Sequence, residues 1–474
     1  MRDNISGYTI RLQQLLFGLL LLVVGLYATR SMMRGGTGNL QLAVAAVVGV
    51  FLVLLLDRHY WILCPIGFAA GSLIPSIRGV NTAEMGCLIV VATHFVRRAL
   101  RHDETLHFRP MVLFALPYFV WAAISFVMNP PGLYSLGGQT IGARFYFKLI
   151  IAFWAMVVLS LQELKEDDCR HLFYALIITS SCVFVKSVYL RSLAVVDDGA
   201  VTDYALLPAA AVFFWLMSRY RLSRFLSISW RSLAAAVLLL AVLFSGKRRG
   251  AFNVAIFPLI RAFVARQDRA KAVVIYTVAI IPLVLMLAGQ GNFYNLPLPV
   301  QRGLCFLPAK WDGRVAHYAS GEDPFRDNVR SYAWQTVREK PLFGRKGFAI
   351  PLEEIFWVNY GGTTHDYEGH AVSGNWHNTW IGMMADFGIP AAFWWAMFCG
   401  AMLYIVHTRL RESRPGSYQS TVLVYYYCAF ALMLLASHTS GHSSLQPFQW
   451  WPAFGLVLAV TTPSSLKELE LDCA

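Results

Sequence analysis

The amino-acid sequence predicts an all-α fold, a polytopic bundle of transmembrane helices, from three observations. Of its 474 residues, 57% are hydrophobic and 14% are charged, whereas soluble domains average about 45–50% and about 25%. The apolar residues occur in blocks of 15–20, close to the length that crosses a bilayer core of about 30 Å. The net charge of +13 fits the Lys and Arg excess of cytoplasmic loops, so we expect membrane lipids and no nucleic acid as partners.

The apolar blocks predict 12 to 14 membrane spans, and fourteen agrees best with the charges. The fourteen blocks cover residues 12–28, 39–56, 60–76, 81–96, 110–128, 141–160, 171–190, 203–218, 232–246, 250–264, 272–289, 389–406, 421–437 and 447–461. They divide the chain into N-terminal transmembrane helices, a large loop, C-terminal transmembrane helices and a tail, at residues 1–289, 290–388, 389–461 and 462–474. No small-x-small cleavage site follows the first block, so we expect an uncleaved helix.

Positively charged loops give the bundle an orientation. Counting fourteen spans places the arginine-rich loops on one side, at residues 97–109, 219–224, 261–271 and 409–414. Because cytoplasmic loops are enriched in Lys and Arg, that side is predicted to be the cytoplasm, together with both chain ends. The large loop then lies outside the cytoplasm.

The large loop is predicted to be a folded element. Aromatic residues are spread through its polar sequence: Trp311, Phe325, Trp334, Phe343, Phe348, Phe356, Trp357 and Trp376. Apolar residues recur at helical spacing between Asn328 and Glu339, which predicts a helix there. Loops positioned by a rigid scaffold often carry function, so a functional site is expected on this side.

Several cations on the external side break the positive-inside pattern. They are Arg144 and Lys148 in the sixth span, Lys247, Arg248 and Arg249 in the turn Ser245–Ala251, and Arg330 in the large loop. Cations at membrane depth are costly and often mark an anionic ligand. Lys247 and Arg248 fit equally well as cations that extend to lipid headgroups, whereas Arg249, next to Gly250, favours a functional role. Because carboxylates are scarce in the spans and guanidinium groups bind phosphate oxygens in pairs, the pattern favours a diphosphate ligand over an ion-coupled transporter.

Three motifs on this side resemble those of the O-antigen ligase and O-antigen polymerase superfamily. They are the turn Ser245–Ala251 with Arg249, then Arg330-Ser331-Tyr332-Ala333-Trp334 followed by Pro341-Leu342-Phe343-Gly344, then His377-Asn378 with nine residues before Gly388. They are similar to the family's Ser-Arg-Gly turn, its Arg-x3-Trp helix with a Pro-x-x-Gly turn, and its His-Asn motif. The resemblance covers about residues 200–460.

The sequence departs from the family pattern in three places. Ala391 stands where Gly, Thr or Tyr is usual, and Gly344-Arg345-Lys346-Gly347 replaces Gly-x-Gly. Three residues, Gly-Lys-Arg, separate Ser245 from Arg249. These departures concern the subgroup more than the superfamily.

The resemblance implies a GT-C-like glycosyltransferase at the periplasmic face of the bacterial inner membrane. Such an enzyme moves a glycan from undecaprenyl diphosphate to an acceptor hydroxyl, on lipid A-core or another glycan, with inversion and without a metal or other cofactor. His377 is the predicted general base, because a neutral imidazole accepts the proton of the attacking hydroxyl near neutral pH. The cations predicted to stabilise the departing diphosphate are Arg249 and Arg330, with Arg144, Lys148 and Arg248 as further candidates.

Other interpretations stay open from the sequence. Without the family motif, His377 fits a helix-capping residue beside Asn378. The segment from His365 to His370 matches no standard zinc spacing, so a solvated loop is expected there. A polymerase that extends lipid-linked chains is the alternative within the superfamily, and one large external loop favours a ligase. A polysaccharide flippase or exporter is expected to carry polar residues along whole helices, and a scaffold protein leaves both His377 and Arg249 unexplained.

Overall fold

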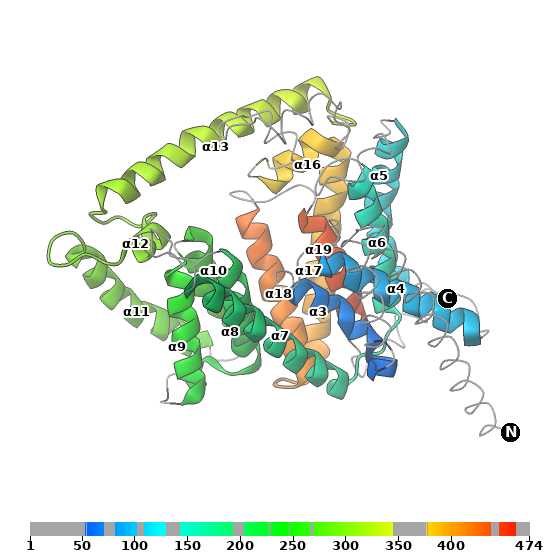
Figure 1. Ribbon diagram of the computed structural model, residues 1–474, viewed down its shortest axis with the longest axis horizontal. Coiled ribbons are helices and arrows are strands. Elements are labelled where there is room, and N and C mark those ends of the chain that lie inside the picture. The colour runs from blue at the N-terminus through cyan, green and yellow to red at the C-terminus, as the bar shows by residue number, and fades with distance from the viewer. Residues whose placement is uncertain are drawn as a thin grey trace, which may run out of the picture.

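The computed structural model describes the part of the chain that holds most of the predicted spans. The described residues are 53, 55–70, 81–101, 109–128, 143–192, 203–225, 227, 229–245, 247–265, 269–344, 376, 378–437 and 445–460. Within these ranges the chain is almost entirely helical, with two isolated β-bridges and no strand (Figure 1). The first two predicted spans, 12–28 and 39–56, fall almost wholly outside them.

Most described helices begin and end within a few residues of a predicted span. These are α4 (Thr82–Arg101), α5 (Leu116–Met128), α6 (Ala143–Ser160), α7 (Glu166–Ser192), α8 (Asp203–Arg219), α9 (Trp230–Leu243), α10 (Arg248–Val264), α11 (Arg269–Gly289), α17 (Ile389–Glu412), α18 (Tyr418–Ala436) and α19 (Leu445–Ala459). The shorter elements are η1 (Asp57–Ile62), α3 (Leu63–Ala69), η2 (Pro110–Phe114), η4 (Leu222–Phe225), α12 (Leu298–Leu304) and α16 (Thr379–Phe387). The predicted third span, 60–76, corresponds to η1 and the seven-residue α3.

Four of the described helices are long and apolar enough to cross a membrane: α7 over Glu166–Tyr189, α11, α17 and α18. Shorter apolar helical segments lie at Leu116–Met128, Tyr146–Ser160 and Trp230–Leu243. Such helices indicate a membrane protein. The sequence predicted 12 to 14 spans, so its count exceeds the four described helices that reach full length and apolarity.

The core lies where α6 and α19 pack against each other. A Cβ added at Gly455 would lie 2.5 Å from the carbonyl oxygen of Met156, so a glycine allows the two backbones to approach. Beside this contact the Phe398 and Trp451 rings lie 4.1 Å apart and both side chains are fully buried. The pair fixes α19 against α17.

The C-terminus of α19 is held by two arginines from other segments. Arg409, in the last turn of α17, donates from Nη1 to the carbonyl oxygens of Val457, Leu458 and Val460 at 2.9, 2.8 and 2.6 Å. Arg109 Nη1 donates to Leu458 at 2.5 Å. The last carbonyls of a helix have no partner within it, and cations there interact favourably with its dipole. Both arginines belong to loops assigned to the cytoplasm.

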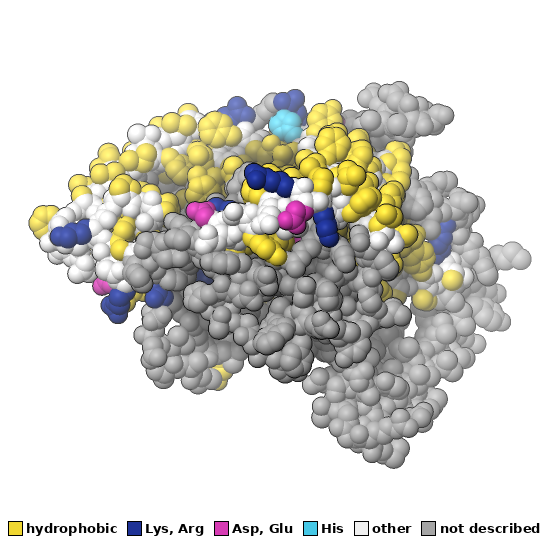
Figure 2. Space-filling model, turned by 90° about the horizontal axis from the view of Figure 1, so that it is seen from above, with side chains coloured by type: hydrophobic (Ala, Val, Ile, Leu, Met, Phe, Trp, Pro, Cys, Tyr) yellow, Lys and Arg dark blue, Asp and Glu magenta, His cyan; other side chains and the backbone are white. Residues whose placement is uncertain are grey.

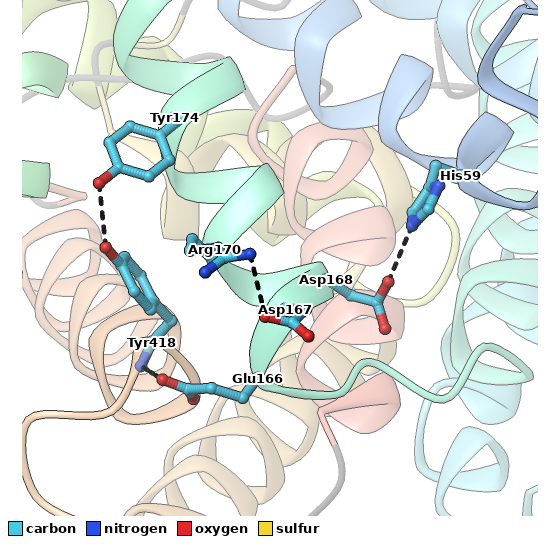
Figure 3. A network of polar contacts seen from close by, with 7 residues as sticks. All are labelled: His59, Glu166, Asp167, Asp168, Arg170, Tyr174 and Tyr418. Atoms are coloured by element: carbon cyan, nitrogen blue, oxygen red, sulfur yellow. Dashed lines mark hydrogen bonds and ion pairs between the residues drawn. The ribbon is translucent and has the colours of Figure 1, made fainter.

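Other segments assigned to the cytoplasm meet at this same end of the bundle. The backbone nitrogen of Leu164 donates to the last carbonyl of α19 at 2.8 Å. Nearby, His59 Nε2 lies 3.1 Å from Asp168 Oδ1, and the backbone nitrogen of Tyr418 donates to Glu166 at 2.6 Å (Figure 3). Contacts between η1, α7 and α18 therefore join segments that are far apart in the sequence.

A 27-residue helix, α13 (Gly313–Glu339), runs along the other end of the bundle from α12 to α16 (Figure 1). The sequence predicted only its second half, from Asn328. Asp312 caps the helix by accepting a hydrogen bond from the backbone nitrogen of Arg314 at 2.9 Å. That hydrogen bond lowers the pKa of the Asp312 carboxyl.

Candidate functional site

Two of the three sequence motifs meet in a tight joint. The turn Pro341–Gly344 lies against the end of α16, where the backbone nitrogen of Ile389 donates to the Pro341 carbonyl at 2.8 Å. Gly388 and Gly344 have φ angles of +85° and +63°, which side chains disfavour. A Cβ at Gly388 would overlap the carbonyl of Leu342, and one at Gly344 would lie 2.5 Å from the backbone of α16. Both motif glycines are therefore required by this geometry.

A stacked aromatic pair covers the joint. The rings of Trp121, in α5, and Phe343 lie 5.4 Å apart with 2° between their planes. Trp121 Nε1 also donates to the carbonyl oxygen of Phe387 at 2.9 Å. The joint is thereby tied to the N-terminal half of the bundle, for which the motifs give no signal.

The helix that carries the second motif packs on the segment that carries the third. Val329, Ala333 and Val337 of α13 share a buried cluster with Trp376 and with Ala385 of α16. Trp376 is fully buried. The cluster joins the two motifs through the residue directly before His377.

Trp376 also makes a polar contact that the sequence did not predict. Its Nε1 donates to Oδ1 of Asp386 at 3.0 Å, and Asp386 is only 5% exposed. An aromatic residue directly before His377 was the one signal in the sequence for this contact.

Asn378 is the N-cap of α16. Its side-chain oxygen accepts from the backbone nitrogens of Trp380 and Ile381 at 3.0 and 3.1 Å. The cap is anchored to the end of α18, since Ser437 accepts from the backbone of Thr379 at 2.9 Å and from Trp380 Nε1 at 2.6 Å. The capping role that one interpretation gave to the motif histidine thus belongs to its neighbour.

His377 itself lies outside the described residues, as do the segment His365–His370 and the residues His438 and His442. The residues on either side of His377, Trp376 and Asn378, are described and buried. The structure therefore fixes the two neighbours of the predicted base, and the prediction for its side chain stays a prediction.

Arg330 lies on α13 beside the buried face of that helix. It follows the fully buried Val329, and its own side chain is 30% exposed. Its Nη1 lies 3.3 Å from Oδ1 of Asp327, which is itself largely exposed. An exposed ion pair of this kind contributes little to stability.

Three of the predicted cations lie at the turn between α9 and α10. Lys247 is the N-cap of α10 and has extended backbone. Its backbone nitrogen donates to the hydroxyl of the buried Ser245 at 3.4 Å. Arg249 is exposed in the first turn. One Arg248 nitrogen, Nη2, is buried and has no hydrogen-bond partner among the described residues. Because a buried unsatisfied donor costs about 1–3 kcal/mol, an acceptor from a ligand or from the rest of the chain is expected there.

Packing connects this turn to the motif helix. Ala251, in the first turn of α10, clusters with Val300 and Leu304 of α12, and α12 in turn contacts the start of α13. α10, α12, α13 and α16 therefore form a continuous series of packed helices (Figure 1). The series carries Arg249 and Arg330 on separate elements.

Lys148 is occupied by a different partner. Its Nζ lies 2.8 Å from Oε1 of Glu84, and both side chains are buried. Glu84, which the sequence placed near a helix end, neutralises a cation that was predicted to bind diphosphate. Arg144 is in the first turn of α6, and its side chain lies outside the described residues.

An apolar groove of about 920 Å³ opens beside the first turn of α16. Its lining residues come from α10, α16, α17 and α18: Leu259, Ile260, Phe263, Val264, Trp380, Ala396, Cys399, Gly400, Leu403, Tyr427, Ala431, Leu434 and Leu435. Along α18, from Tyr427 to Leu435, it extends about 12 Å at 1.5 Å per residue. An open, elongated apolar groove of this kind suits a hydrocarbon chain.

The described surface on the α13 side carries broad areas of hydrophobic side chains with few charged groups between them (Figure 2). Phe293 and Leu342, both from the predicted external loop, are 89% and 59% exposed. Large exposed apolar areas mark membrane or partner contacts.

The chain was also compared with known proteins. No family model and no curated protein matches it. The superfamily resemblance therefore depends on the three motifs and on the joint that brings two of them together.

Proposed function

We propose that this protein is an O-antigen ligase-like glycosyltransferase. It would transfer a glycan from undecaprenyl diphosphate to an acceptor hydroxyl at the periplasmic face of the bacterial inner membrane. The joint between Pro341–Gly344 and Gly388 carries the proposal, because it brings the helix with Arg330 into contact with the segment that carries Trp376 and Asn378, the neighbours of His377. These motifs are separated by more than thirty residues of sequence, so their packing is an independent argument for the resemblance.

In the proposed reaction His377 accepts the proton of the acceptor hydroxyl as its oxygen attacks the anomeric carbon. The bond from that carbon to the phosphate oxygen breaks, and undecaprenyl diphosphate leaves with both electrons. Arg249 and Arg330 stabilise the negative charge that accumulates on the diphosphate. Arg248 Nη2 is buried without a hydrogen-bond partner among the described residues, which favours Arg248 as a further ligand. The ion pair with Glu84 makes Lys148 a weaker candidate.

The apolar groove supports a lipid-linked donor over a soluble nucleotide sugar. Trp380, in the first turn of α16 and two residues after Asn378, is one of its lining residues. A polyprenyl chain in this groove would place its diphosphate near the start of α16, where the predicted base lies in the sequence. A nucleotide-sugar enzyme has no need of such a groove.

Replacement of His377 by alanine tests the proposal in cells. We expect His377→Ala to insert at the wild-type level and to transfer no glycan, because the attacking hydroxyl keeps its proton. His370→Ala, a nearby histidine outside the motif, is the matched control and should transfer normally. Full transfer by His377→Ala would exclude the base assignment.

The lipids of a deletion strain distinguish the two activities within the superfamily. A strain without the ligase accumulates long glycan on undecaprenyl diphosphate, whereas one without the polymerase accumulates single repeats. Neither accumulation is expected if the protein only exports a finished polysaccharide. We expect the first pattern.

A further inference from the structure

A second cluster of chemically reactive side chains lies at the other end of the bundle. His59 in η1 and Asp168 and His171 in α7 each contribute one ligand atom, and these atoms lie within 4.8 Å of one another. His59 approaches Asp168 from a separate element (Figure 3). We propose that these three side chains bind a divalent transition-metal ion, and that zinc fits them best.

The distances are close to those of a zinc site. Zinc binds nitrogen and oxygen at about 2.0–2.2 Å, so two ligands of a tetrahedral ion lie about 3.3 Å apart. His59 Nε2 and Asp168 Oδ1 are already 3.1 Å apart. The rings of His59 and His171 are 5.4 Å apart and nearly perpendicular, at 78°, so small rotations bring a nitrogen of each to one point.

The local sequence explains why the carboxylate is well placed. Asp168 and His171 are three residues apart in α7 and therefore share one face of the helix. The second oxygen of Asp168, Oδ2, accepts a hydrogen bond from the backbone nitrogen of Lys165 at 3.1 Å. This leaves Oδ1 directed at His59, the kind of outer hydrogen bond that orients metal ligands.

Charge and exposure also favour a cation. Nearby charges pair with one another, Arg170 with Asp167 at 3.1 Å, whereas the cluster combines one carboxylate with two imidazoles. The side chains of His59 and Asp168 are 22% and 18% exposed, so an ion can enter from solvent. Two histidines and a carboxylate suit borderline metals such as zinc, and three protein ligands leave one position for water.

The cluster is remote from the proposed transfer site. Its neighbour Glu166 accepts from the first residue of α18, and the residue after α18, Ser437, contacts α16. The 19 residues of α18 span about 28 Å. The metal would join η1 to α7 without touching the transferred glycan, so the inference does not rest on the proposed function.

Metal binding can be measured on the full chain, purified in detergent with a histidine-free tag. We expect about one Zn²⁺ per chain by mass spectrometry of the metal, and a melting temperature that rises with added Zn²⁺. Replacing Zn²⁺ by Co²⁺ should give the strong visible absorption of a tetrahedral site. Absence of bound Zn²⁺ and of any thermal shift in the wild-type chain would overturn the proposal.

Two single variants locate the site. His171→Ala removes an exposed ligand and should leave folding intact while weakening Zn²⁺ binding by at least about 100-fold, since even loss of an outer partner costs about 10- to 100-fold. Asp167→Asn changes the adjacent carboxylate, outside the cluster, and should bind Zn²⁺ like the wild type. Unchanged binding by His171→Ala, or equal loss in Asp167→Asn, contradicts the assignment.

Discussion

Lys148 and Glu84 form a buried ion pair between α6 and α4, with Nζ 2.8 Å from Oε1. Glu84 also exchanges hydrogen bonds with Asn81, whose side-chain oxygen accepts from the Glu84 backbone at 2.8 Å. This reciprocal pattern is a capping box at the start of α4. One carboxylate therefore caps α4 and neutralises a cation of α6.

Breaking this pair from one side should destabilise the protein more than removing both charges. Lys148→Met leaves a buried carboxylate alone, which costs about 3–5 kcal/mol. The double variant Lys148→Met with Glu84→Gln should recover much of that loss. Thermal unfolding of the variants in detergent measures the coupling, and glycan transfer by the double variant tests the diphosphate role. Loss of glycan transfer in a double variant that is still stable would support a role for Lys148 in diphosphate binding.

Arg249→Lys distinguishes diphosphate binding from an interfacial cation. Lysine keeps the charge but cannot bind two phosphate oxygens at once. Loss of one charge-assisted hydrogen bond, about 1.5–3 kcal/mol, should lower transfer by about 10- to 100-fold. The neighbouring exchange Lys247→Arg, at the exposed cap, should leave transfer unchanged. A wild-type rate of glycan transfer in Arg249→Lys would show that Arg249 contacts lipid headgroups and does not bind the diphosphate.

Gly388→Ala tests the joint between the motifs. A positive φ costs a non-glycine residue about 1–3 kcal/mol, and the overlap with the Leu342 carbonyl adds to it. We expect a lower melting temperature and reduced transfer. Gly313→Ala is the control, because nothing lies within 4 Å of a Cβ there. Equal stability of the two variants would show that the joint is not as tight as described.

Asn378→Ala tests whether the motif asparagine acts as a helix cap. Loss of its two hydrogen bonds to α16 should cost about 1 kcal/mol. Asn378→Asp retains an oxygen acceptor and should keep most of the stability. Melting temperatures of the two variants give the comparison. If both variants lose transfer while only alanine loses stability, the amide has a second role near the predicted base.

The sequence predicted the apolar helices well and the polar ones less well. α8 and α17 begin at the predicted residues, 203 and 389, because a long apolar block has few ways to fold in a membrane. α13 was predicted from Asn328 and begins at Gly313. Its first half contains Gly321 and Pro324, two residues that usually break helices.

The candidate site was predicted only in its local motifs. Pro341–Gly344 and Gly388 were recognised as members of sequence motifs. Their contact joins residues more than forty positions apart and depends on the close approach of two backbone segments, which the sequence does not show. The stacked Trp121 lies still farther away, in α5. The ion pair between Glu84 and Lys148 could not be predicted either, because no local periodicity links residues that are 64 positions apart.

Arg109 and Arg409 lie in loops that are predicted to be cytoplasmic, and both also hold the end of α19. During insertion, positive charge alone retains a loop in the cytoplasm, and lysine serves as well as arginine. In the folded chain, Arg109 donates from two separate nitrogens, Nη1 to Leu458 and Nη2 to Gln162, and Nη1 of Arg409 reaches the carbonyls at the end of α19. Lysine has a single nitrogen on a different stem, so it cannot reproduce this two-nitrogen geometry. A chain with lysine at both positions should therefore insert with the wild-type orientation but lose helical structure in the last turn of α19. At these two residues biogenesis depends on charge, whereas the finished fold depends on the shape of the guanidinium group.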